Sequence, residues 1–296
     1  MKANAMCIAC MVAKQEKLIR PFFEEGRKTE YMHRVLEILY RHGRFESSPW
    51  LAEQIGQCYE SFWGEKEDYT RIKHQYNQLL LDKEMEIEGH IHGAKDPIEA
   101  CIKYVCAANY IDFSAVENVN GQTFGKLLEK AGCESVPKSE YKEFKKDLEK
   151  ADTLVYLLDN CGEIVLDKVF MKFLKEFYPG LRITAIVRGR EVLNDATMED
   201  AREVGLTELV SCVGNGNGAP GTVLKRFDRE AKRLLMDADL VISKGQGNFE
   251  GLFGEGLNSY YLFLCKCELF VRRFGLGQYE SVFANELRIQ GLTESE

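Results

Sequence analysis

The spacing of apolar positions changes near residue 150 of this 296-residue chain. Before that point apolar residues recur every three or four positions, as in the stripe from Ile98 to Val105. This spacing places apolar side chains on one face of a helix, and a proline near the start, as in Asp96-Pro97, is typical of a first helical turn. We therefore predict an α-helical domain over residues 1–150, with helices at 29–41, 50–63, from 98 onwards, and 139–151.

Beyond residue 150, short apolar runs alternate with helical patterns. Strands that alternate with helices indicate βαβ units with right-handed crossovers and a mostly parallel sheet. We predict strands at 154–158, 183–187, 210–213, 240–243 and 260–264. We predict helices between them at 164–177, 198–204 and 223–236. The fold class is therefore α/β, with the sheet domain spanning residues 151–296.

Composition and charge narrow the possible partners. The formal charge is −8 and the pI is near 5.4, with no basic stripe, so we do not expect nucleic acid as a partner. No apolar segment approaches the roughly 18–20 residues that span a bilayer, so we expect no membrane insertion. The first residues also lack the apolar stretch of a signal peptide. We expect a cytoplasmic protein, and its oligomeric state stays open.

The candidate chemistry lies in the segments that follow the predicted strands. Asp159 and Asn160 follow the first strand, Asp195 lies in the loop after the second, and Ser243-Lys244-Gly245 ends the fourth. In a parallel sheet these segments meet at one edge, where ligands bind. Carboxylate and amide oxygens suit a Mg²⁺-like ion, and a lysine beside glycines suits a phosphoryl group. The alternative is an ordinary Asx turn that caps a helix.

Four motifs along the chain together resemble the damage-control phosphatase family, long catalogued as domain of unknown function 89. They are Asp159-Asn160-Cys161-Gly162-Glu163, Asn194-Asp195-Ala196-Thr197, Lys-Gly-x-Gly-Asn-Phe-Glu from Lys244, and Asp96-Pro97 followed by Asn109-Tyr110-Ile111-Asp112. The resemblance runs from about residue 5 to about residue 280. It implies a Rossmann-like α/β domain with a helical region packed on it, and a divalent metal between them.

The resemblance also implies roles for single residues. Asp159, Asn160 and Asp195 would hold the metal, which would be Mg, Mn, Ni or Co. Lys244 would meet the substrate phosphate and, with the three ligands, would form the catalytic set. We expect further substrate contacts from six residues, which are Asn109, Asp112, Glu163, Arg188, Ser243 and Asn248.

Two cysteine features stand apart from these motifs. Cys7-Ile-Ala-Cys10 is a CxxC motif that could bind a second metal or act as a redox pair, and Cys265 and Cys267 could complete a four-thiolate site. The family resemblance places this CxxC in the prokaryotic branch. Cys161 could act as a nucleophile, although its sequence neighbours are not basic. Reduced core cysteine is the simpler interpretation for most of the ten cysteines.

We predict from these observations a metal-dependent phosphatase that hydrolyses phosphate monoesters of small metabolites, either sugar phosphates or related damaged phosphometabolites. Two alternatives stay open at this point. One is an S-adenosylmethionine-dependent carboxyl methyltransferase, although the first strand lacks the glycine-rich turn that usually receives that cofactor. The other is a non-catalytic protein that binds a metal or metabolite.

Overall fold

The computed structural model describes residues 1–64, 68–109, 125 and 129–289. Asp112, a predicted substrate contact, lies outside these residues. The helices before the sheet are α1 (Ala5–Ile19), α2 (Glu25–His42), α3 (Ser48–Trp63), α4 (Thr70–Leu81), α5 (Glu84–His92), α6 (Pro97–Ala108) and α8 (Lys138–Lys150). The predicted helical character of this part of the chain therefore agrees with the structure.

Strands and helices alternate from residue 153 onwards. The strands are β1 (Thr153–Leu157), β2 (Arg182–Val187), β3 (Ser211–Gly214), β4 (Leu240–Lys244), β5 (Ser259–Leu264) and β6 (Ser281–Asn285). The helices are α9 (Glu163–Phe177), α10 (Met198–Glu203), α11 (Leu206–Leu209), α12 (Arg229–Met236), α13 (Gln246–Leu252) and α14 (Glu268–Phe274), with short 3-10 turns at Leu224–Arg226 and Glu286–Arg288. The helix predicted over 223–236 is interrupted, because Phe227 has an extended backbone between the 3-10 turn and α12.

Within the described part of the chain, the strands form one sheet in the order β3-β2-β1-β4-β5-β6. All neighbouring strands are parallel except β5 and β6, which are antiparallel. The predicted α/β fold with a mostly parallel sheet is thus confirmed. The strand order reverses between β1 and β4, and in sheets of this kind a crevice opens there beyond the carboxyl ends of the strands.

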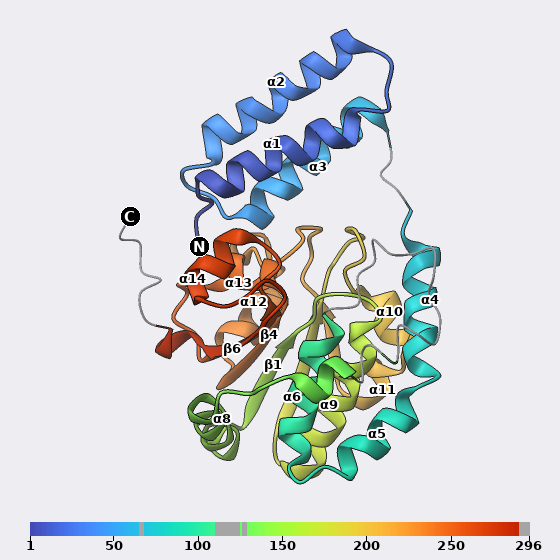
Figure 1. The fold of residues 1–296 in the computed structure, drawn as a ribbon, viewed down its shortest axis with the longest axis vertical. Helices are drawn as coiled ribbons and strands as arrows, with labels where there is room; N and C mark the ends of the chain where they lie inside the picture. The colour runs from blue at the N-terminus through green and yellow to red at the C-terminus, as the bar shows by residue number, and fades with distance from the viewer. Residues whose placement is uncertain (65–67, 110–124, 126–128, 290–296) are drawn as a thin grey trace.

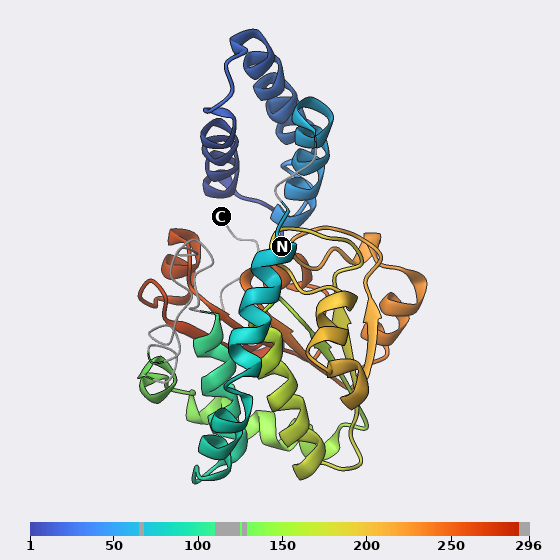
Figure 2. The same cartoon turned by 90° about the vertical axis from the view of Figure 1, so that its right-hand side faces the viewer.

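Alternate residues of the strands supply two separate hydrophobic cores, one on each face of the sheet. Leu154, Tyr156 and Leu158 point to the face covered by α4, α5, α6, α8 and α9. Val155 and Leu157 point to the face covered by α12, α13 and α14. Side chains that alternate along a strand produce this division. Figures 1 and 2 show the resulting layers of helix, sheet and helix.

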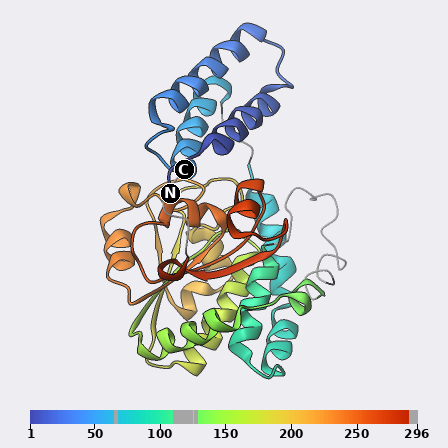
Figure 3. The same ribbon diagram turned by 60° about the vertical axis from the view of Figure 1, so that its left-hand side comes forward.

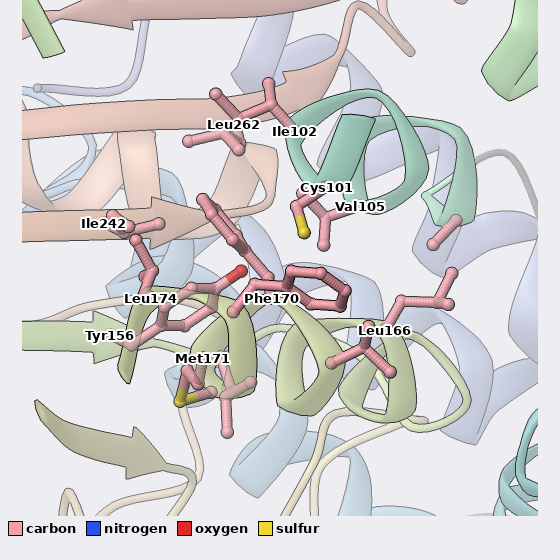
Figure 4. Packing of buried hydrophobic residues seen from close by; sticks show 14 of the residues in the cluster. Cys101, Ile102, Val105, Tyr156, Leu166, Phe170, Met171, Leu174, Ile242 and Leu262 are labelled. Atoms are coloured by element: carbon pink, nitrogen blue, oxygen red, sulfur yellow. The ribbon is translucent and has the colours of Figure 1, made fainter. Parts of the chain in front are cut away.

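The first of these cores joins the helices before the sheet to the sheet itself. Figure 4 shows Cys101, Ile102 and Val105 of α6 next to Leu262 of β5 and to Phe170 of α9. Helices α6 and α9 lie against each other along this face. The helical segment from α4 to α8 therefore packs as one of the layers on the sheet.

Helices α1, α2 and α3 form a lobe with a hydrophobic core of its own. This core contains Ile19, Tyr31, Val35, Leu39, Leu51 and Ile55. The lobe stands beyond the sheet in Figures 1 and 3, and α3 reaches the α/β body mainly through α13. The predicted boundary at residue 150 stays a prediction, and the hydrophobic cores separate at a different place, after α3.

Candidate active site

The candidate site lies at the carboxyl ends of β1 and β4, where the strand order reverses. Asp159 follows β1 directly after Leu158, and Lys244 is the last residue of β4. Gly245 comes next with φ +81°, and a Cβ at this position would collide with the Asp159 carboxylate. Glycine therefore lets the end of β4 approach the segment that follows β1.

The loops after β1 and β2 are tied together through their backbones. Asn160 and Asp195 form an antiparallel bridge. The Cys161 N–H donates to the Asn194 carbonyl at 2.9 Å, and the Ala196 N–H donates to the Asp159 carbonyl at 2.8 Å. The structure thus brings the three predicted metal ligands together, although 35 positions separate Asn160 from Asp195 in the numbering.

Arg188 lies between the two aspartates. Its Nε is 2.6 Å from Oδ2 of Asp195, and its Nη2 is 3.6 Å from Oδ1 of Asp159. Its Nη1 donates to Oδ1 of Asn248 at 2.9 Å. The Arg188 side chain is almost fully buried, whereas 15% of the Asp159 side chain is exposed. Arg188 therefore compensates part of the negative charge of the aspartates, and its role as a substrate contact stays a prediction.

The Glu163 carboxylate connects three other residues of the site. Its Oε1 accepts hydrogen bonds from Nδ2 of Asn109 at 2.7 Å and from Nδ2 of Asn160 at 2.8 Å. Its Oε2 accepts one from Nζ of Lys244 at 3.1 Å. Asn109 ends α6, so this carboxylate joins the helical layer to the ends of β1 and β4.

Lys244 is completely buried and paired with two carboxylates. Besides Glu163, its Nζ contacts Oδ1 of Asp167 at 3.0 Å, and the Tyr156 hydroxyl donates to the same oxygen at 2.6 Å. Burial alone would lower the pKa of Lys244, but Asp167 and Glu163 outweigh burial and raise that pKa. Lys244 is therefore a cation in the folded protein.

Sequence reasoning missed Asp167 and Tyr156. The sequence spacing could have indicated Asp167, because Glu163 and Asp167 are four residues apart. They therefore lie on one face of α9, where both carboxylates can reach one cation. Burial raises the pKa of Asp167, and Lys244 opposes this rise.

Two more predicted residues, Asn248 and Ser243, are buried at the end of β4 and just beyond it. Nδ2 of Asn248 donates to the carbonyls of Leu158 at 3.0 Å and Lys244 at 2.6 Å, so it braces the ends of β1 and β4. The Ser243 hydroxyl is buried and has no hydrogen-bond partner among the described residues. Neither arrangement tests the predicted contact with substrate.

The electrostatics of the site suit a divalent cation. Burial raises the pKa of Asp159 to about 7, and the nearby carboxylates of Asp195 and Glu163 add to the shift. Burial also raises the pKa of Asp195, against the effect of Arg188. The network holds four carboxylates, with Asp167 included, against the two buried cations Arg188 and Lys244. A divalent cation would balance this excess of negative charge and would find oxygen ligands there.

The cysteines do not form a four-thiolate site within the residues that the structure describes, and a redox or metal role of the Cys7 and Cys10 pair stays a prediction. No group of three or more His, Cys, Asp or Glu side chains is arranged to hold a metal there, so a site of four thiolates is not formed. Cys7 is half-buried and Cys10 is exposed on α1, and both are free thiols. Burial raises the pKa of Cys161, which disfavours the thiolate form that a nucleophile needs.

Comparison with known proteins extends these observations. A family model described as the damage-control phosphatase ARMT1-like domain matches residues 3–282. The chain belongs to this family. A damage-control phosphatase of Archaeoglobus fulgidus is 27% identical over 285 residues, covering 93% of this chain and 96% of the relative. Damage-control phosphatase PH1575 of Pyrococcus horikoshii is 30% identical over 273 residues, covering 90% and 92%.

The fold comparison agrees with family membership. The crystal structure of a DUF89 family protein from Pyrococcus horikoshii superposes with a TM-score of 0.81 at 22% identity, covering 97% of this chain and 99% of that chain. Membership in the damage-control phosphatase family confirms the predicted phosphatase activity and favours it over the two alternatives. The assignment of the CxxC motif to one branch of the family stays a prediction.

Among the described residues, no helix is long and apolar enough to cross a membrane.

Proposed function

We propose that this damage-control phosphatase hydrolyses phosphate monoesters of small metabolites, such as sugar phosphates, at one divalent cation held by Asp159, Asn160 and Asp195. The observation that supports this set most strongly is the backbone bridge between Asn160 and Asp195, because it brings two carboxylates and an amide from separate loops to one place. Oxygen donors of this kind suit Mg²⁺ or Mn²⁺, and they also accept Ni²⁺ or Co²⁺.

When bound, the cation would neutralise phosphoryl charge and lower the pKa of a water molecule. The protein's own residues hold the surrounding charges in place. Arg188 would neutralise Asp195 and remain close to Asp159, since its guanidinium contacts both. Lys244 would supply positive charge from the end of β4, with the phosphoryl group replacing Glu163 as one of its partners. Asn109 would keep Glu163 oriented through its 2.7 Å hydrogen bond.

The test is phosphate release from a panel of sugar phosphates with Mg²⁺, Mn²⁺, Ni²⁺ or Co²⁺. We expect Asp159→Ala to reduce release by more than about 100-fold, since loss of even an indirect metal contact commonly costs 10- to 100-fold. Asp152→Ala is the matched control, because Asp152 precedes β1 at its opposite end and is exposed. An Asp159→Ala protein that keeps full metal-dependent activity would rule out this site.

A thermal-shift experiment separates the phosphatase from the methyltransferase alternative. We expect Mn²⁺ to raise the melting temperature of the intact chain and S-adenosylmethionine to leave it unchanged, because a ligand stabilises only the folded state that binds it. The reverse result would favour the methyltransferase.

A further inference from the structure

Through one buried side chain, Asn77, helix α4 contacts the loop after β1 and the helix α10 that follows the loop after β2. Asn77 is completely buried. Its Oδ1 accepts a hydrogen bond from the Gly162 N–H at 2.7 Å. Its Nδ2 donates to Oδ1 of Asp200 at 3.1 Å and to Oε2 of Glu203 at 2.7 Å. The amide therefore uses its acceptor and both of its donor hydrogens, and all three partners are distant in the sequence.

The Gly162 partner belongs to the loop after β1. Gly162 lies between Cys161, whose N–H donates to the Asn194 carbonyl, and Glu163, the hub of the site. Gly162 has a φ of +72°, which favours glycine, and a Cβ at this position would lie only 3.1 Å from the Cβ of Tyr76 on α4. The end of this loop is thus fitted closely against α4.

Asp200, a second partner of Asn77, holds the end of the loop after β2 through hydrogen bonds to Thr197. Oδ2 of Asp200 accepts hydrogen bonds from the Thr197 N–H at 2.8 Å and from the Thr197 hydroxyl at 2.9 Å. The backbone N–H of Asp200 bonds in return to the Thr197 side chain, and this reciprocal pair is a capping box at the start of α10. Thr197 is two positions beyond Asp195. Nζ of Lys73, one turn before Asn77 on α4, also contacts Oδ2 of Asp200 at 2.7 Å. Lys73 balances the charge, and Asn77 connects this carboxylate to the other loop.

We infer that Asn77 is a positioning residue, which fixes the spacing between the loop that carries Asp159 and Asn160 and the loop that carries Asp195. This inference rests on the proposed function, because the spacing matters if these residues share a cation. Only an amide meets the requirement, since one oxygen must accept from Gly162 while one nitrogen donates to two carboxylates. Aspartate in its place would have no nitrogen donor and would repel Asp200 and Glu203.

The experiment measures Mn²⁺ binding by isothermal titration calorimetry, and phosphate release as a function of Mn²⁺ concentration. We expect Asn77→Ala to weaken Mn²⁺ binding by about 10-fold or more, the range seen when residues that orient metal ligands are lost. We also expect saturating Mn²⁺ to restore most of kcat, because the ligands themselves remain.

Two controls separate positioning from general stability. Gln78→Ala removes a 3.2 Å hydrogen bond to Glu203 from the same helix but touches neither loop, so Mn²⁺ binding should change less than about twofold. Leu80→Ala removes a buried side chain of α4 and lowers the melting temperature without removing a loop contact. Circular dichroism and the melting temperature establish whether each variant folds. If Asn77→Ala does not fold, Asn77→Ser takes its place.

The outcomes distinguish this inference from the proposed function. If the intact chain binds Mn²⁺ and the folded Asn77 variant binds it equally well, the positioning role is wrong and the proposed function stands. Equal weakening in Leu80→Ala would also overturn the positioning role, because loss of stability alone would then explain the effect. If the intact chain binds no Mn²⁺, both proposals fail.

Discussion

Ion pairs in the α1–α3 lobe and in the candidate active site are of opposite kinds. In the lobe, Arg34 and Arg41 contact Glu37 within one helix, and 38–65% of these side chains is exposed. In the site, Lys244 contacts Glu163 and Asp167 from a different element, and at most 1% of these side chains is exposed. The lobe pairs are screened by water, whereas the site pairs act in an interior where an unmatched charge is costly.

This difference in burial indicates which of the two regions carries out the chemistry of the protein. Exposed ion pairs on a helix contribute at most a few tenths of a kcal/mol to the unfolding free energy, so other polar residues could replace them at little cost. Buried pairs are often no more stabilising than apolar residues of the same size. We interpret the buried network at the ends of β1 and β4 as one kept for function.

Lys244→Met should give the largest loss. It removes the cation between Glu163 and Asp167 and leaves two buried carboxylates facing each other. Loss of one partner of a buried ion pair costs about 3–5 kcal/mol of unfolding free energy. Urea denaturation measures this change, and phosphate release should be lost as well. A variant as stable as the intact chain would contradict the claim that these charges depend on one another.

The metal-free protein should lose stability as the pH rises from 4 to 7. The pKa of Asp159 is raised from 3.8 to about 7, so the folded state holds a proton that the unfolded state has released in this range. Its stabilising contribution is present at low pH and disappears as the pH passes 7, with a size of about 1–3 kcal/mol. Urea denaturation in EDTA at pH 5 and pH 7.5 measures this loss.

Asp159→Asn is the matched variant for this pH experiment, because asparagine keeps the size of the side chain and cannot ionise. Its unfolding free energy should fall less between pH 5 and pH 7.5 than that of the intact chain. Identical pH profiles for the two proteins would show that Asp159 does not carry the shifted proton.

Glu37→Gln in the lobe should have the smallest effect. It breaks both arginine contacts of Glu37, but all three side chains are exposed. We expect the unfolding free energy to change by less than about 0.5 kcal/mol and phosphate release to stay unchanged. A loss comparable with that of Lys244→Met would remove the distinction between the two regions.

The sequence predicts the strands of the sheet closely, for a physical reason. Central strands buried on both faces appear as continuous apolar runs, and the predicted 260–264 run corresponds to Ser259–Leu264. The edge strand Ser281–Asn285 was not predicted, and neither was α13. Helix α13 contains Gly247 and Gly251, which lower helix propensity, but the backbone of Thr222 approaches Gly251 so closely that no side chain would fit.

The candidate site was predictable where its residues follow strands. Asp159 and Lys244 stand out because each ends an apolar run, and parallel strands bring such ends together. The partners of these residues were not predictable in the same way. Asn77 comes 85 positions before Gly162, and no local pattern connects them. Tyr156 lies between apolar residues of β1, so the sequence predicts an ordinary core residue at this position. Only the structure shows its 2.6 Å hydrogen bond to Asp167.

A crystal structure of the Mn²⁺-loaded protein, with anomalous scattering recorded at the manganese edge, tests the central claim most directly. We predict one strong anomalous peak within coordination distance of side-chain oxygens of Asp159, Asn160 and Asp195. A peak found elsewhere, for example beside Cys7 and Cys10, with none between Asp159 and Asp195, would contradict it.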